Sequence, residues 1–247
     1  MLELRDDPLI DLPRSEARHG LGLFETILVK GGRPLWLNWH LERLSEGTRF
    51  LRMDAPPPEV ELLRRAESRF ELARVREGVL RLYAVDGAIG MDLARNLPPR
   101  PAVGSAALSR RTRRLSGSPQ CRFKTFSYIE SVLLTREASE RGLSEAIALN
   151  ENGRLTDGGT TNLFVILDGR LLTPPAAEGA LPGTARRLLL ESGLAAEASL
   201  APAELGRAEA AFLTNALRLV FPLENLEGRA LDPAHPLIRE AASLFAF

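Results

Sequence analysis

The sequence predicts an α/β (α+β) protein that folds as two domains. Its 247 residues are enough to bury one or two hydrophobic cores. Segments with helical spacing of apolar residues alternate along the chain with segments of strand-like alternation. Residues 113–119 are rich in Arg, Ser, Gly and Pro, a composition typical of a linker. We therefore expect a small N-terminal α/β domain over residues 1–112 and a larger C-terminal α/β domain over residues 120–247.

The composition is ordinary for a soluble globular protein, with 45% apolar and 26% charged residues. The formal net charge is zero, which gives no support to a nucleic-acid or membrane partner. No apolar stretch reaches transmembrane length, and the acidic N-terminus does not resemble a signal peptide. A single cysteine, Cys121, excludes an internal disulfide and suits a reducing compartment. We expect a cytoplasmic protein.

Periodicity and turn residues predict the elements of the first domain. Leucines at helical spacing mark the first helix, and three consecutive prolines introduce the second. The expected elements are a strand (21–29), a hairpin turn (30–33), helices (36–53 and 59–74), a strand (78–85), a loop (86–96) and the start of a further strand (97–101).

The second domain is predicted in the same way. A hairpin is indicated by two apolar runs on either side of Asp168-Gly169. The expected elements are a helix from Lys124 to residue 141, a strand (146–149), a turn (152–153), the hairpin (162–166 and 170–173), a helix opened by residues 179–186 and an amphipathic closing helix within residues 232–247.

Lysine is scarce in this chain, because only Lys30 and Lys124 occur among 32 basic residues. Arginine stays protonated in proteins, whereas a buried lysine can lose its proton and act as a nucleophile or base. Lys30 lies in the predicted hairpin turn, where a solvated side chain is expected. Lys124 is therefore the candidate for Schiff-base formation with an aldehyde cofactor, with a solvated surface lysine as the alternative.

The residues around Lys124 follow a recognisable order: a helix, a strand, the turn Asn152-Gly153 and the loop LTDGGTTNLF over residues 155–164. From about residue 20 to about residue 223 the chain resembles the fold-type IV family of pyridoxal-phosphate (PLP) enzymes. That family includes branched-chain aminotransferases, D-amino acid aminotransferases and 4-amino-4-deoxychorismate lyases. The resemblance implies the two-domain D-amino acid aminotransferase-like fold, PLP bound through Lys124, and a homodimer in which both subunits line each active site.

The resemblance assigns three segments to the cofactor phosphate. Arg43 stands in the family's H-x-x-R-L motif, where its planar donors suit a phosphate, although an ion pair with Glu42 or Glu46 is the alternative. Gly183-Thr184-Ala185 opens a helix at the family's phosphate turn, and the amides of such an N-terminus bind anions. Thr214-Asn215 is the third segment, and its alternative is that Asn215 only caps a turn.

Two further residues are assigned to the cofactor ring. Asp157 occupies the position of the family glutamate that keeps the pyridine nitrogen protonated, so that the ring accepts electrons. An Asx-turn residue before Gly158-Gly159 is the alternative. Tyr128 lies one helical turn after Lys124, where relatives carry a tyrosine that hydrogen-bonds the phenolic oxygen of PLP. A tyrosine that only packs in the core is the alternative.

The sequence Thr214-Asn215-Ala216-Leu217 follows the form of the deoxychorismate lyases rather than the S-G-T-A of branched-chain aminotransferases. We expect a lyase that acts on a small amino-acid-like molecule and releases pyruvate and 4-aminobenzoate. One alternative is a class IV aminotransferase of the branched-chain or D-amino acid type. Another is a degenerate PLP-binding protein without activity, because Leu21 replaces a family aspartate and the loop 86–96 offers only Arg95 to substrate carboxylates.

Overall fold

The computed structural model describes residues 3–5, 16–95, 97 and 101–246. These residues group into two compact units. The first unit comprises residues 1–99 and 123–128, and the second comprises residues 100–122 and 129–247. Lys124 thus belongs to the first unit, although the segments before and after it belong to the second.

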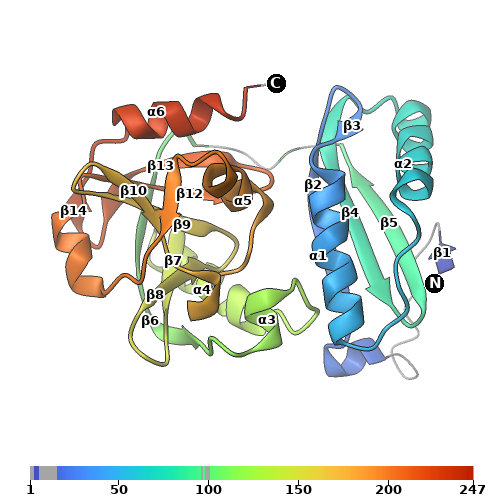
Figure 1. Ribbon diagram of the computed structural model, residues 1–247, viewed down its shortest axis with the longest axis horizontal. Coiled ribbons are helices and arrows are strands. Elements are labelled where there is room, and N and C mark those ends of the chain that lie inside the picture. The colour runs from blue at the N-terminus through green and yellow to red at the C-terminus, as the bar shows by residue number, and fades with distance from the viewer. Residues whose placement is uncertain (1–2, 6–15, 96, 98–100, 247) are drawn as a thin grey trace. The chain divides into compact units, whose positions relative to one another are not determined.

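The first unit is a five-stranded sheet with two helices on one face (Figure 1). The strands are β1 (Glu3–Arg5), β2 (Leu23–Lys30), β3 (Arg33–Pro34), β4 (Glu77–Val85) and β5 (Ala88–Ala94), in the order β1-β5-β4-β2-β3. The helices are α1 (Leu37–Phe50) and α2 (Glu59–Ala73). Alternate residues of the strands, such as Leu80 and Leu82, pack against Leu44 of α1 and Leu62 of α2 to form the core.

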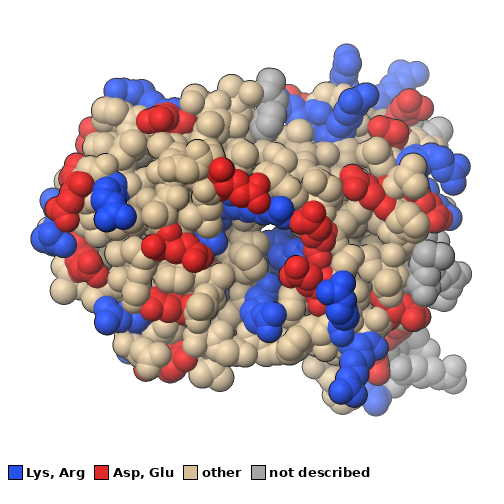
Figure 2. Space-filling view, in the orientation of Figure 1, with Lys and Arg blue, Asp and Glu red and all other residues tan. Residues whose placement is uncertain are grey.

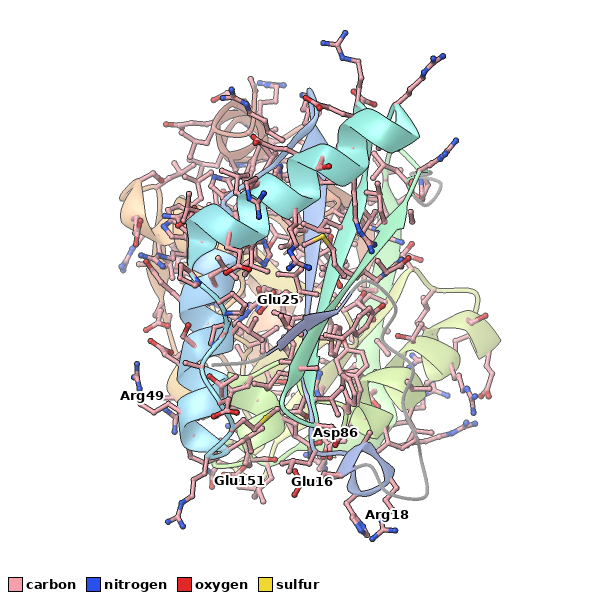
Figure 3. The ribbon with its side chains drawn as sticks, turned by 90° about the vertical axis from the view of Figure 1, so that its right-hand side faces the viewer. Glu16, Arg18, Glu25, Arg49, Asp86 and Glu151 are labelled. Atoms are coloured by element: carbon pink, nitrogen blue, oxygen red, sulfur yellow. The ribbon has the colours of Figure 1, made fainter. Side chains whose placement is uncertain are left out.

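The predicted first strand, hairpin, helices and following strand of this unit are confirmed within a few residues. Gly31 and Gly32 both have positive φ, 61° and 77°, as a type I′ hairpin turn requires. Ahead of β2, a 3₁₀ helix (Glu16–His19) is fixed by a bond from the Glu16 N–H to Asp86 Oδ1 at 3.0 Å (Figure 3).

The predicted loop over residues 86–96 is wrong. Only Asp86 and Gly87 form a turn, with φ of 50° and 73°, and β5 then pairs with β4 along its whole length. Ile89 and Met91 are buried in the core, so the alternation of a strand was present but obscured by the neighbouring glycines. The predicted strand start over residues 97–101 cannot be compared, because residues 96 and 98–100 lie outside the described part of the chain.

The second unit is a nine-stranded sheet that closes on itself. Its strands are β6 (Gly104–Arg114), β7 (Glu145–Asn150), β8 (Leu155–Gly158), β9 (Asn162–Leu167), β10 (Arg170–Thr173), β11 (Ala195–Glu197), β12 (Ala210–Asn215), β13 (Leu219–Leu226) and β14 (Arg229–Ala230). The strand order is β11-β10-β9-β12-β13-β6-β7-β8, with β14 beside β13. A pairing of Asp157 with Asn162 joins β8 to β9 and closes the ring.

Helices of the second unit surround this sheet (Figure 1). They are α3 (Pro119–Arg122), α4 (Ile129–Glu140), α5 (Thr184–Glu191) and α6 (Pro236–Ser243), with 3₁₀ turns at Ala176–Glu178 and Pro202–Arg207. The predicted hairpin about Asp168-Gly169 and the helices opened near residues 183 and 236 are confirmed. Among the described residues no helix is both long and apolar enough to cross a membrane. Acidic and basic side chains are interspersed on the face shown in Figure 2.

The predicted linker over residues 113–119 differs from the structure, because β6 continues to Arg114 and residues 100–122 belong to the second unit. Arginines conceal this strand: Arg111 and Arg113 are exposed, whereas Thr112 and Arg114 are buried. The helix predicted to start at Lys124 begins instead at Ile129. Residues 123–128 are not helical and form an isolated bridge to β2, and they belong to the first unit.

Replacing Phe164 with alanine should lower the free energy of unfolding by about 3–5 kcal/mol, because a fully buried aromatic side chain leaves a cavity. Phe164 of β9 faces Phe212 of β12 with ring centroids 5.0 Å apart. Urea denaturation measures the loss. Val60→Ala, at a position with 74% exposure, is the control and should change stability little. Equal effects of the two substitutions would contradict this packing.

Candidate active-site residues

Residues 123–128 are held beside β2 by an isolated antiparallel bridge between Leu23 and Thr125. The Phe24 N–H donates to the Lys124 carbonyl at 2.8 Å, and the Phe126 N–H donates to the Gly22 carbonyl at 2.9 Å. A Cβ on Gly22 would lie 2.6 Å from the Phe126 ring. The glycine before β2 is therefore required for this close approach, and main-chain bonds rather than a helix fix the position of Lys124.

The Lys124 side chain lies against two aromatic rings of the first unit. Its Nζ is 4.5 Å from the centroid of the Phe24 ring and 5.2 Å from that of Tyr128. The two rings meet edge to face at 5.1 Å. The predicted proximity of Tyr128 to Lys124 is thus present, although it arises from an irregular segment with tight bends and not from a helical turn. Such rings stabilise an ammonium group and shield an amine from water.

Tyr83 was missed by the sequence analysis. It is the cross-strand partner of Phe24, and its ring lies 6.5 Å from that of Phe126. Burial raises the pKa of its hydroxyl. The strand alternation of β4 could have identified it, because Tyr83 and Arg81 point to the face opposite Leu80 and Leu82.

Glu25, His40 and Arg43 form a buried ion-pair network in the first unit. Glu25 Oε1 accepts from Arg43 Nε at 2.8 Å, and Oε2 accepts from Arg43 Nη2 at 2.7 Å. His40 Nδ1 lies 2.7 Å from the same Oε2. Burial by itself raises the pKa of Glu25, but the charge of Arg43 and the hydrogen bond from His40 outweigh it and lower the pKa to about 2. The carboxylate that pairs with Arg43 in the structure is therefore that of the buried Glu25 on β2.

Asp157 is buried in the second unit at the point where the sheet closes. Its Oδ1 lies 3.2 Å from Arg114 Nε, and its Oδ2 accepts from the Leu181 N–H at 2.9 Å. It is a strand residue of β8, and the Gly159 N–H donates to Glu145 instead. Asp157 is thus a buried strand residue with an arginine beside it, and Glu145 is a partner of the Gly159 N–H.

Arg114 lies in the segment predicted as a linker, yet it is the buried counter-ion of Asp157. Only 6% of its side chain is exposed. Besides Asp157, it donates to Ser131 Oγ at 3.1 Å and to the Gly158 carbonyl at 3.0 Å, and it lies 3.4 Å from Glu130. The pairing of β6 with β7 shifts register between Leu108 and Arg113, and this irregularity ends immediately before Arg114. No sequence pattern signals that shift.

Glu145 holds the loop that follows Asp157. Its carboxylate accepts from the Gly159 N–H at 3.1 Å, from the Thr160 N–H at 3.3 Å and from the Thr161 hydroxyl at 2.9 Å. Burial raises the pKa of Glu145, although these hydrogen bonds partly offset the effect. The buried Glu145 side chain thus holds the loop between β8 and β9 in place.

The predicted phosphate segments of the second unit meet around Asn162. The Asn162 amide donates to the Leu181 carbonyl at 2.8 Å, and a Cβ on Gly183 would lie 2.2 Å from Asn162 Oδ1. Thr184 and Ala185, the first residues of α5, are buried. Thr214 is the cross-strand partner of Asn162.

Asn215 connects two turns of this region. Its amide donates to the Thr160 carbonyl at 3.2 Å, and its Oδ1 accepts from the Leu217 and Arg218 N–H groups. It therefore does cap the turn between β12 and β13, and it also ties that turn to the loop after Asp157.

The donor set suits an anionic cofactor. The Thr214 hydroxyl is buried with no hydrogen-bond partner among the described residues, which is costly unless a ligand supplies one. The amides at the start of α5 are the donors that a phosphate prefers. A lysine between aromatic rings, a buried carboxylate and these donors are the groups that PLP requires, so the residues present fit that cofactor.

Replacing Arg114 with methionine should lower the free energy of unfolding by about 3–5 kcal/mol, because it leaves Asp157 buried without its cation. The loss should be much smaller in an Asp157→Asn background, which urea denaturation of the four proteins of the cycle would measure. Arg111→Met, which removes an exposed pair with Glu140, is the control and should have little effect. Additive losses would show that Arg114 and Asp157 do not interact.

Comparison with known proteins gives a consistent family. The sequence profile of the amino-transferase class IV family matches residues 22–226. A bifunctional aminodeoxychorismate lyase / D-amino acid transaminase of Mycobacterium tuberculosis is 28% identical over 96% of this chain and 92% of its own length. A protein of Methanocaldococcus jannaschii, provisionally named a branched-chain-amino-acid aminotransferase, is 26% identical over 87% of this chain and 81% of its own.

The fold agrees as well. A solved structure from Legionella pneumophila, provisionally named a 4-amino-4-deoxychorismate lyase, covers 98% of this chain and 97% of its own with a TM-score of 0.88 at 23% identity. At that identity the likeness concerns the fold. Taken with the profile match over most of the sequence, it shows that the chain belongs to the amino-transferase class IV family and is a PLP-dependent enzyme of fold type IV.

Proposed function

We propose that this enzyme is a 4-amino-4-deoxychorismate lyase, which releases pyruvate and 4-aminobenzoate, a precursor in folate biosynthesis. The observation that carries the proposal is the Thr214-Asn215-Ala216-Leu217 segment, whose sequence has the lyase form. In the structure, the Asn215 side chain of this segment links its turn to the loop that follows Asp157. The M. tuberculosis relative, which is similar over nearly the whole chain, is named for the same lyase activity.

Lys124 is the residue to which the cofactor would be attached and the base that would move protons on the substrate. A primary amine can do both, because it forms a covalent bond to an aldehyde and can exchange a proton once it is released. PLP, when bound, supplies that aldehyde and a ring that accepts electrons from the bond that breaks. Phe24 and Tyr128 would keep water away from the amine and fix its direction. The Tyr128 hydroxyl is proposed to donate to the phenolic oxygen of the cofactor.

Asp157 would hold the proton on the pyridine nitrogen. A buried carboxylate is suited to this role because Arg114 supplies it with a cation and the Leu181 N–H, which donates to it, restrains its rotation. Arg43, the backbone of Gly183, Thr184 and Ala185 at the start of α5, and the Thr214 hydroxyl are proposed to bind the phosphate. Gly183 is the residue before α5, and its N–H donates to the Leu181 carbonyl at 2.8 Å in this structure. We also propose a homodimer, as the resemblance to fold-type IV enzymes implies.

An aminotransferase acting on branched-chain or D-amino acids is the second candidate. The relatives named for transamination favour it, since one is a branched-chain type and another carries a D-amino acid activity beside the lyase. Lys124 and Asp157 would serve both reactions. A degenerate protein is disfavoured, because the lysine, the carboxylate and the donor groups are all present.

Borohydride reduction should attach the cofactor irreversibly to Lys124, since a reducible carbon–nitrogen double bond is expected there. Peptide mapping of the reduced protein locates the label. Lys124→Ala should remove the label, and Lys30→Ala, at an exposed hairpin position, should leave it unchanged. A label on Lys30, or no label after reconstitution with PLP, would rule out the assignment of Lys124.

A substrate panel tests the proposed reaction. Aminodeoxychorismate should yield pyruvate and 4-aminobenzoate in a coupled assay, whereas L- and D-amino acids with 2-oxoglutarate or pyruvate should turn over at least tenfold more slowly, or about 1.4 kcal/mol in barrier. Asp157→Asn should lower kcat on the preferred substrate because the ring loses its ionised partner. Faster turnover of an amino acid and oxo-acid pair would assign the enzyme to the aminotransferases.

A further inference from the structure

We propose that Glu25 and His40 are positioning residues for Arg43, and that they hold its guanidinium in the one orientation that receives the cofactor phosphate. This inference rests on the proposed binding of the phosphate by Arg43. It assigns a task to two buried ionisable residues, one on β2 and one on α1, that the proposed reaction does not otherwise use.

The contact between Glu25 and Arg43 fixes a plane. Two parallel bonds, Nε to Oε1 at 2.8 Å and Nη2 to Oε2 at 2.7 Å, join the guanidinium to the carboxylate edge to edge. Paired bonds of this kind determine the orientation of both groups, whereas a single bond leaves rotation free. Glu25 lies in the interior of the first unit beside α1 (Figure 3), with 1% of its side chain exposed. It therefore has no alternative rotamer into water.

His40 fixes the carboxylate in turn. The ring is fully buried, and its Nδ1 lies 2.7 Å from Glu25 Oε2. Burial lowers the pKa of His40, and the nearby charges of Arg43 and Lys124 lower it further, against the raising effect of Glu25. The imidazole is then neutral at pH 7, and because Glu25 is ionised, Nδ1 must carry the proton and donate it. His40 and Arg43 are three residues apart on α1, so both reach the same carboxylate.

The charges show what the network contributes. Glu25 and Arg43 neutralise each other and His40 is neutral, so the three side chains carry no net charge at pH 7. A neutral network attracts a phosphate weakly from a distance. Its contribution is a rigid set of N–H donors on an arginine that keeps 10% of its side chain exposed. Geometry, rather than the sum of charge, should therefore govern phosphate affinity at this arginine.

Glu25→Asp separates geometry from charge, because the carboxylate remains but is withdrawn by one methylene. The measured quantity is the ratio of the affinities for PLP and for pyridoxal, which lacks the phosphate, by fluorescence titration of the full-length apoenzyme. Glu25→Asp should lower this ratio about tenfold. A tenfold change in affinity is slightly less than a charge-assisted hydrogen bond to the phosphate typically contributes. Glu46→Asp, the same change at an exposed position of α1, is the matched control and should alter the ratio less than about twofold.

A pair of substitutions at His40 gives an independent measurement if Glu25→Asp folds poorly. Asparagine can place an N–H near the position of Nδ1, whereas leucine cannot. His40→Asn should retain most of the PLP-to-pyridoxal ratio, and His40→Leu should lower it as Glu25→Asp does. Thermal unfolding of each apoprotein reports stability separately from the ratio.

Arg43→Ala tests the binding of the phosphate by Arg43 separately from the positioning roles of Glu25 and His40. If it leaves the ratio unchanged, the phosphate assignment is wrong and the inference fails with it. If Arg43→Ala lowers the ratio but Glu25→Asp and His40→Leu lower only the unfolding temperature, the assignment stands and the inference alone is overturned. A reduced ratio in Arg43→Ala, Glu25→Asp and His40→Leu, with Glu46→Asp and His40→Asn near the parent value, supports it.

Discussion

Buried carboxylates impose the main constraint on this structure. An ionised carboxylate taken out of water costs several kcal/mol unless a cation or several N–H groups compensate it. Glu25 and Asp157 both satisfy this requirement with an arginine from a neighbouring element of the same unit, Arg43 and Arg114. The pairings tie β2 to α1 and β8 to β6. Both arginines and both carboxylates are therefore fixed before any ligand binds.

Close approach of main chains is the second constraint. The chain passes from the second unit to the first at residue 123, and residues 123–128 bond to β2. It returns to the second unit at residue 129. A side chain on Gly22 would meet the Phe126 ring, so this path is open only to glycine. As a consequence, Lys124 lies on a segment that is hydrogen-bonded to β2. These main-chain bonds restrain the position of Lys124, the residue that we propose to carry the cofactor.

Asp157 is a position at which this chain departs from the family pattern. Aspartate at position 157 is one methylene shorter than the family glutamate, and the structure shows both of its oxygens held, by Arg114 and by the Leu181 N–H. Each oxygen of a carboxylate can accept more than one bond, so these contacts leave room for a further donor. The M. tuberculosis and M. jannaschii relatives carry lyase and transaminase names at 28% and 26% identity, and the residues that the two reactions share do not discriminate between them.

The sequence by itself determined the family, most helices and strands, and the segments that surround Asn162. Local patterns sufficed, because periodicity, glycine turns and motif order are properties of short stretches. Only the tertiary structure decided that Arg114 is a buried partner of Asp157, that Glu25 pairs with Arg43, and that Tyr83 opposes Phe24. Those contacts join residues 18 to 59 positions apart through strand register and an irregularity in β6. Register is set by the pairing of whole strands, and a shift of one residue turns a side chain to the opposite face, so no short stretch of sequence contains that information.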